Sequence, residues 1–228
     1  MRLKRWNLTR FEKGLWFVST AAILVSFALS GGGNPLTAAV SVLGVTGLLF
    51  IAKGYVLGQV LIAVFAAIYG GISFFQQYYG EVITYVGMTM PSAIVTAVIW
   101  ARHPFQGTRE VTVSRLTKGR IAVIAAVTVA STAVFYGLLC ACGNADLEVS
   151  TLSVATSMIA SCLTAFRSPY YALGYASNDV VLIVLWTIAA VRDASMWPMA
   201  MCFWVFLFND IYGFVQWRRM QRRQQTSG

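Results

Sequence analysis

The sequence predicts an all-α integral membrane protein with eight transmembrane helices, and three observations lead to that class. Of the 228 residues, 58% are hydrophobic and only 11% are charged, whereas soluble domains have about 25% charged residues. The apolar residues form eight runs, each near the ~20 residues that a membrane-spanning helix needs. The basic residues lie in the tails and short loops between these runs, as they do in membrane proteins.

The apolar runs give the predicted helices in chain order. They are residues 14–30, 36–52, 55–79, 81–100, 121–142, 149–166, 170–191 and 197–217. The second and the sixth are short. The first is not typical of a cleaved signal peptide, because its basic leader is long and residues 30–35 (Ser-Gly-Gly-Gly-Asn-Pro) indicate a turn into the next helix.

The distribution of Lys and Arg predicts the orientation of the chain. If residues 1–13 are cytoplasmic, strict alternation places every Lys and Arg except Arg192 on the cytoplasmic side. Both termini are therefore expected inside, with the loops at residues 31–35 and 143–148 outside. The net charge of +9 then suits anionic lipid headgroups. No nucleic-acid partner is expected, because no stacking platform or basic helix face accompanies the charge.

A repeat is visible on either side of the long loop at residues 101–120. A short helix that ends in a base is followed by a longer helix, and a third helix ends in Trp100 or Trp217. One linker helix between two triplets gives both triplets the same orientation, so the predicted repeat is parallel. Trp100 and Trp217 are interpreted as anchors at the membrane interface. The predicted divisions are 1–35 (tail and additional helix), 36–100 (first repeat), 101–148 (loop and linker helix), 149–217 (second repeat) and 218–228 (basic tail).

Two pairs of polar residues lie inside otherwise apolar helices. Asn178 precedes Asp179, and Asn209 precedes Asp210. A carboxylate in the middle of a membrane helix costs roughly 2.5–3.5 kcal/mol on insertion scales, so such residues usually face a protein interior or a watery cavity. These pairs therefore indicate a small-molecule site between the triplets.

Three segments carry a resemblance to a known family. They are residues 79–91 (Tyr-Gly-Glu-Val-Ile-Thr-Tyr-Val-Gly-Met-Thr-Met-Pro), residues 168–186, which include Asn178-Asp179, and residues 209–220. Between about residues 36 and 223 the chain resembles the PnuC family of bacterial vitamin B3 transporters. The resemblance implies a SWEET-like fold of three, one and three helices, with one extra N-terminal helix here. It also implies facilitated diffusion of nicotinamide riboside across the inner membrane, with a cytoplasmic kinase that traps the substrate without stable contact.

Nicotinamide riboside has a ribose, a carboxamide and a cationic aromatic ring. Amides suit the carboxamide and the hydroxyls, Tyr and Trp faces suit the cationic ring, and an acid suits its charge. The predicted substrate-binding residues are Asn178, Asn209, Asp179, Asp210, Tyr212, Gln216, Gln59, Tyr85, Trp186 and Trp204. Asn209, Tyr212 and Gln216 share one helix face. Glu81 is interpreted as solvated near the outer end.

Several alternatives stay open at this point. Relatives in the wider family carry deoxynucleosides, thiamine or riboflavin, and Asp179 with Asp210 could make the protein a proton symporter. The same two residues meet the minimum for an intramembrane aspartyl enzyme, but the Gly-x-Gly-Asp signature is absent, so no enzyme is expected. A sensor subunit is disfavoured because no soluble output domain accompanies the helices. The scattered cysteines predict no metal or cofactor. The lipid bilayer is an expected partner, and a homo-oligomer is compatible with the sequence.

Overall fold

The computed structural model describes residues 8–29, 35–75, 79–144 and 146–226. The elements are α1 (Arg10–Leu29), α2 (Pro35–Ala52), α3 (Val56–Phe75), α4 (Tyr79–Thr84), η1 (Tyr85–Thr89), α5 (Met90–Ala101), α6 (Lys118–Ala141), α7 (Leu147–Ala165), α8 (Tyr171–Arg192), η2 (Ala194–Met196) and α9 (Trp197–Thr226). Residues 1–7 of the predicted cytoplasmic tail, and residues 31–34 of the first predicted outer loop, lie outside the described residues.

The helical class and the membrane character are both confirmed. Within the described residues no strand forms, and only two isolated β-bridges join backbone segments. Seven of the described helical spans are long and apolar enough to cross a membrane by length and composition, and the apolar part of α2, Ala38–Ala52, is shorter. The chain is therefore a multi-pass membrane protein.

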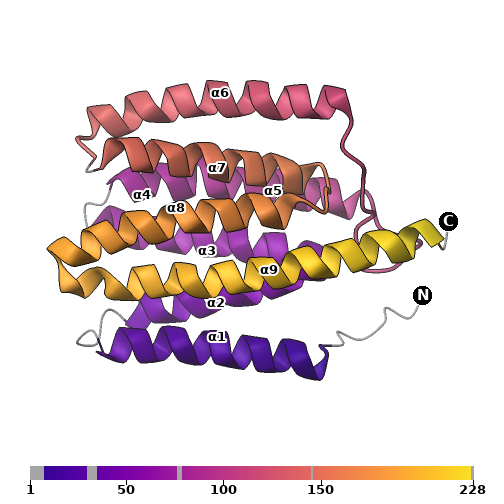
Figure 1. Ribbon diagram of the computed structural model, residues 1–228, viewed down its shortest axis with the longest axis horizontal. Helices are drawn as coiled ribbons and strands as arrows, with labels where there is room; N and C mark the ends of the chain where they lie inside the picture. Colours follow the sequence, from indigo (N-terminus) through magenta and orange to yellow (C-terminus); the bar gives the residue numbers. More distant parts are fainter. Residues whose placement is uncertain (1–7, 30–34, 76–78, 145, 227–228) are drawn as a thin grey trace.

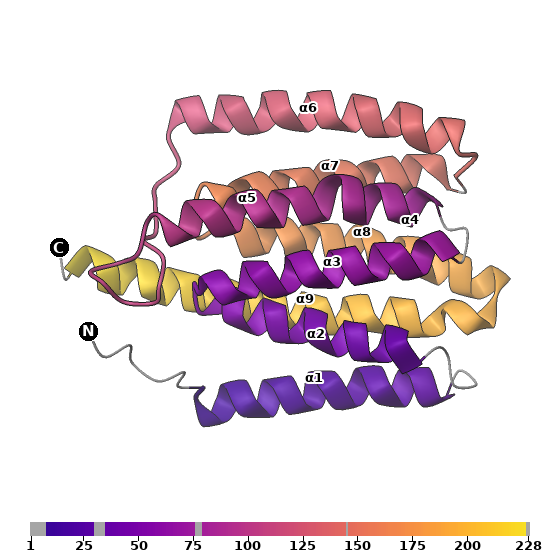
Figure 2. The same cartoon turned by 180° about the vertical axis from the view of Figure 1, so that it is seen from behind.

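Six helical spans pack in a ring, in the order α2, α3, α5, α7, α8 and α9, with α9 returning to α2. We call α2, α3 and α4–η1–α5 the first triplet, and α7, α8 and α9 the second triplet. The triplets meet along two seams, where α2 packs on α9 and α5 packs on α7. Figures 1 and 2 show the remaining two helices at opposite edges of the bundle, α1 beside α2 and α6 beside α7.

Specific polar contacts attach α1 to the ring at the seam between α2 and α9. Glu12 is only 1% exposed, and both of its carboxylate oxygens accept hydrogen bonds from Lys53 Nζ, at 2.8 and 2.9 Å. Farther along the same helix, Trp16 Nε1 donates to Thr46 Oγ1 at 2.9 Å. Thr9 and Glu12 form a reciprocal capping box at the start of α1.

The predicted helix at residues 81–100 is interrupted by a π-helical turn, η1. Pro91 has no N–H to donate and its ring crowds the carbonyl of the preceding turn, so the regular hydrogen-bond ladder fails just before α5. The turn lies very close to α3: a Cβ on Gly70 would meet Val86 Cγ2 at 2.4 Å. Only glycine fits at residue 70, and this close approach places Tyr85 against α3.

The last helix is longer than the apolar run that predicts it. The run ends at residue 217, but α9 continues through the basic residues to Thr226. Gln224 fixes this extension by accepting from Val113 N at 2.8 Å and donating to Val111 O at 3.0 Å. The long loop between α5 and α6 is thus folded against the bundle end. Figure 1 shows that α1 begins and α9 ends at this same end, which we call the basic end; the opposite end is called the mouth.

Candidate functional site

A cavity of about 840 Å³ lies inside the ring, within the 300–1,000 Å³ range of small-molecule sites. All six helical spans of the ring contribute to its wall. On α8 the lining extends from Tyr171 to Arg192, which is about 31 Å of helix at 1.5 Å per residue. The cavity therefore follows the bundle axis over most of the length of a membrane helix.

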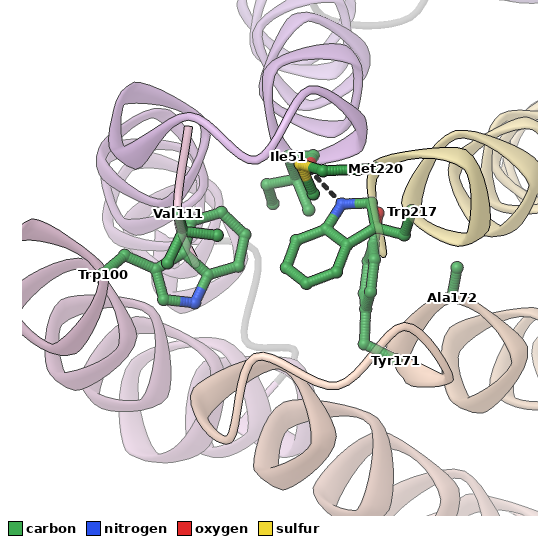
Figure 3. Close-up of a cluster of buried hydrophobic side chains, with 7 residues drawn as sticks. All are labelled: Ile51, Trp100, Val111, Tyr171, Ala172, Trp217 and Met220. Atoms are coloured by element: carbon green, nitrogen blue, oxygen red, sulfur yellow. Dashed lines mark hydrogen bonds between the residues drawn. The ribbon is translucent and has the colours of Figure 1, made fainter. Parts of the chain in front are cut away.

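The basic end of the cavity is closed by an aromatic floor, formed by Trp100, Tyr171 and Trp217. Each of these side chains is at most 2% exposed. Figure 3 shows the two indole rings next to each other; their centroids are 5.3 Å apart, and Tyr171 packs edge-on against Trp217 at 4.8 Å. Because Tyr171 also lines the cavity, the cluster forms its closed end.

Two hydrogen bonds across the seams hold the floor in place. Trp100 of the first triplet donates from Nε1 to Thr164 O of α7 at 3.0 Å. Trp217 of the second triplet donates from Nε1 to Ile51 O of α2 at 2.9 Å. The interpretation of these two tryptophans as interface anchors is therefore wrong. Each indole N–H finds a carbonyl at a helix end inside the protein, and the ring is buried instead of meeting the lipid headgroups.

A polar layer lies above the floor. Its side chains are Gln59, Asn178, Asp179 and Asp210, each 4–7% exposed. Asn178 Oδ1 accepts from Thr156 Oγ1 at 2.9 Å, and the carboxyl groups of Asp179 and Asp210 interact directly with each other. Gln59 Nε2 and Asp179 Oδ2 have no hydrogen-bond partner among the described residues. An unpaired buried polar group costs about 1–3 kcal/mol, so the Gln59 amide nitrogen indicates a ligand.

Hydroxyl groups line two neighbouring walls of the cavity. Those on η1 and α5 are Thr89, Ser92 and Thr96, and those on α7 are Ser150, Ser153, Ser157 and Ser161. Both sets repeat every three or four residues, so each set presents one helix face to the cavity. A ligand with several hydroxyl groups of its own can exchange hydrogen bonds along these walls.

Aromatic side chains surround the cavity nearer the mouth, and we call them the collar. Tyr69 and Tyr85 have ring centroids 4.6 Å apart, and Phe65 lies within 6 Å of both, at 5.6 and 5.7 Å. Trp186 and Phe203 line the cavity from the second triplet. Trp186 is seven residues beyond Asp179, which places the collar about 10 Å above the polar layer.

The charges in the cavity are mostly negative, in contrast to the whole chain. Five of the eight Asp and Glu residues line it, namely Glu81, Asp146, Asp179, Asp193 and Asp210. Among the described residues, Arg192 is the only Lys or Arg that does so. Arg192 is bound by Asp146 through two hydrogen bonds of 2.6 and 2.8 Å. The cavity therefore suits a cation or a polyhydroxyl compound and disfavours an anion.

Comparison with known proteins identifies the family. Residues 34–219 match the family model described as "Nicotinamide mononucleotide transporter". The chain belongs to this transporter family. The resemblance to PnuC found in the sequence is confirmed by a curated relative from Neisseria mucosa, named nicotinamide riboside transporter PnuC. That relative is 26% identical over 227 residues, which cover 94% of this chain and 83% of the relative.

A solved member of the family has the same fold. The crystal structure of the vitamin B3 transporter PnuC matches with a TM-score of 0.80 at 22% sequence identity. The match covers 96% of this chain and 94% of the other. The two chains therefore share their fold.

Six of the ten predicted site residues line the cavity of this transporter. They are Gln59, Tyr85, Asn178, Asp179, Trp186 and Asp210. The other four are Asn209, Tyr212, Gln216 and Trp204, which do not line it. Trp204 is 45% exposed on the outer surface of α9, where an aromatic ring meets lipid.

The other three residues face α1. Asn209 Nδ2 donates to Ser19 Oγ at 3.0 Å, Tyr212 Oη donates to Glu12 Oε1 at 3.0 Å, and Gln216 Nε2 donates to Tyr212 Oη. Their shared face was correctly predicted. The sequence does not show, however, that this face meets the added helix while the neighbouring Asp210 faces the cavity. We therefore do not include these four residues in the proposed site.

Sequence reasoning missed two features of the site, Glu81 and the serines of α7. Glu81 was interpreted as solvated, yet it lines the cavity and accepts a hydrogen bond from the buried Ser73. The serines of α7 carried a usable signal, because their spacing in the sequence already defines one helix face.

Proposed function

We propose that this transporter takes up nicotinamide riboside, the compound in the name of its relative from Neisseria mucosa. The observation that supports this most directly is the cavity, which combines acids, amides, hydroxyls and an aromatic collar. The cationic nicotinamide ring suits the collar and the acids. The ribose hydroxyls and the carboxamide suit Gln59, Asn178, Asp179 and the hydroxyl walls.

The charge of the cavity favours the riboside over the mononucleotide named in the family description. A phosphate is usually bound by Arg, by Lys or by a helix N-terminus. Among the described residues, the only basic side chain in the cavity is Arg192, and both of its terminal nitrogens already bind Asp146. A phosphate group would therefore meet carboxylates without a free counter-charge.

The mechanism we propose is facilitated diffusion with alternating access. The eight spans would form a SWEET-like core of three, one and three helices with parallel repeats, and α1 would be an addition. The reciprocal bonds of Trp100 and Trp217 support the repeat, because each triplet donates an indole N–H to the other. With the floor closed, the arrangement would correspond to an outward-facing state, and release would require the floor to open as the triplets rock.

The proposed location is the bacterial inner membrane, with both termini and the floor on the cytoplasmic side. The supporting observation is that the Lys and Arg residues gather at the end where the floor lies. A cytoplasmic kinase would trap the imported riboside, with no stable contact to the transporter. Alkaline phosphatase fused after Thr226 is then expected to be inactive, and periplasmic activity of the fusion would contradict the orientation.

Purified protein in lipid vesicles tests the transport proposal. Labelled nicotinamide riboside is expected to equilibrate to equal concentrations on both sides, without a pH gradient. Unlabelled riboside should compete strongly, while thiamine, riboflavin and deoxynucleosides should compete weakly, and nicotinamide mononucleotide should compete least because of its phosphate. If one of these compounds enters in place of the riboside, the substrate assignment is wrong.

A second candidate function is proton-coupled symport. It is favoured by one observation, the direct interaction of Asp179 with Asp210 inside the cavity, because paired carboxyl groups in a membrane can carry protons. An imposed proton gradient would then concentrate unmodified riboside in the vesicles. Asp179→Asn would abolish that accumulation and leave exchange intact. Equal concentrations with and without the gradient would exclude this candidate.

An intramembrane aspartyl enzyme would instead convert its ligand, and unaltered riboside recovered from the vesicles would exclude it.

A further inference from the structure

Near the mouth, two side chains of α3 contact two side chains of α4–η1. Tyr69 and Ser73 are four residues apart on α3, and Glu81 and Tyr85 are four residues apart on the opposing span, so each pair shares a helix face. Ser73 Oγ donates to Glu81 Oε2 at 3.1 Å, and the Tyr69 and Tyr85 ring centroids lie 4.6 Å apart. All four side chains line the cavity.

This arrangement brings one carboxylate next to aromatic rings. Glu81 interacts with the Tyr69 phenol, and Tyr85 lies within electrostatic range of both Glu81 and Asp179. The π-helical turn places Tyr85 here, and π-turns inside helices are frequent at functional sites. Because an aromatic face and a carboxylate both attract positive charge, this corner of the cavity suits a cationic ring.

The other acids of the cavity have different surroundings. Asp146 is occupied by Arg192, and Asp193 is exposed at the mouth, where solvent and salt screen its charge. Asp179 and Asp210 lie in the polar layer about 10 Å deeper, among amide and hydroxyl groups that suit a sugar. Asp179 and Asp210 also have tyrosines nearby, but the two carboxyl groups are paired with each other. Glu81 is the cavity acid that lies beside Tyr69 and Ser73, with no basic partner among the described residues.

We infer that Glu81, Tyr69 and Tyr85 form a cation-selecting subsite at the outer part of the cavity, with Ser73 as the residue that positions the carboxylate. The subsite holds the positively charged ring of the ligand, and the polar layer holds its sugar. The separation of the two layers is of the order of the length of a nucleoside. This inference rests on the proposed function and adds the residue that recognises the charge.

Two ligands that differ in charge but little in shape test the subsite. Nicotinamide riboside is a cation, and its reduced form, which has gained one hydride on the ring, is neutral with the same ribose and carboxamide. The wild-type protein is expected to bind the cation more tightly. Glu81→Gln should weaken binding of the cation by about tenfold, equivalent to about 1.4 kcal/mol, and leave binding of the reduced form unchanged. Glu81→Asp should retain the preference, because it keeps the charge.

Glu148→Gln is the matched control, since Glu148 is exposed at the start of α7 and does not line the cavity. It should leave both affinities unaltered. If Glu81→Gln retains the preference for the cation, or weakens both ligands equally while Glu81→Asp behaves likewise, the inference is wrong. If Asp179→Asn abolishes the preference for the cation and Glu81→Gln does not, the polar layer recognises the charge and the inference is wrong. A wild-type protein that binds neither ligand would overturn the proposed function itself.

Discussion

Gln59 offers a test that separates a ligand-binding residue from a packing residue. Its side chain is 4% exposed, and its Nε2 has no partner among the described residues. Leaving such a group unpaired costs about 1–3 kcal/mol. Gln59→Met keeps the length of the side chain and removes the amide. We therefore expect the ligand-free protein to become more stable, with a rise in Tm of roughly 2–10 °C for a chain of this size.

The same substitution should weaken ligand binding. A hydrogen bond to the ligand contributes about 0.5–1.5 kcal/mol net, so the affinity for nicotinamide riboside should fall by up to about tenfold. Thermal unfolding in detergent and titration calorimetry on the same preparation measure both effects. A higher Tm together with a weaker Kd is expected only if the amide is held ready for a ligand.

Gln224→Met is the matched control. Gln224 is also buried, but its amide oxygen and its amide nitrogen both have backbone partners, Val113 N and Val111 O. The substitution leaves these two groups unpaired, so the Tm should fall and the affinity should stay unchanged. If Gln59→Met lowers the Tm as Gln224→Met does and leaves the affinity intact, Gln59 is a packing residue and the reasoning is refuted.

Three further predictions concern the collar, the two asparagines and the attachment of α1. Gly70→Ala should weaken the affinity for the riboside, because the added Cβ would meet Val86 at 2.4 Å and displace Tyr85. Val86→Ala in the same chain should restore the affinity. Gly71→Ala should leave the affinity unchanged, because nothing lies within 4 Å of a Cβ at that residue. Asn178→Ala should lower the affinity in calorimetry, whereas Asn209→Ala should lower only the Tm; the reverse result would contradict the assigned faces. Glu12→Gln should destabilise the protein by about 3 kcal/mol, because it removes the buried carboxylate that accepts hydrogen bonds from Lys53 and Tyr212; an unchanged Tm would show that this carboxylate contributes nothing.

The sequence predicted the helices well because the membrane imposes their length and apolar character. At the ends of the helices, where the chain passes from lipid to water, the predicted helix boundaries were less accurate. The apolar run of α9 ends at residue 217, yet the helix continues, because Gln224 and the loop at the basic end support it with hydrogen bonds that no hydropathy pattern contains. The interruption before α5 is a local effect of Pro91, which has no N–H to donate to the preceding turn.

The site was predicted as far as residue chemistry allows. An acid and an amide in an apolar helix identify a functional position, and Asp179 and Asp210 do line the cavity. Which of two adjacent residues faces the cavity, however, depends on what packs around the helix. Asn209 and Asp210 are adjacent in the chain, but α9 lies between the cavity and α1, so the two side chains have different partners. Glu81 was missed because a residue so close to the end of its helix was expected to be in contact with water. In the structure the ring of helices encloses it, and it lines the cavity.

The aromatic floor gives the protein an intrinsic optical reporter. Trp100 and Trp217 are 1% and 0% exposed, with ring centroids 5.3 Å apart. Indoles in a dry environment emit at shorter wavelengths than indoles in water, and two rings at this separation couple in the near-ultraviolet circular dichroism spectrum. Opening of the floor would admit water and separate the rings. The rate of that opening can therefore be followed by stopped-flow fluorescence on the unlabelled chain, with Trp217→Phe to assign the signal.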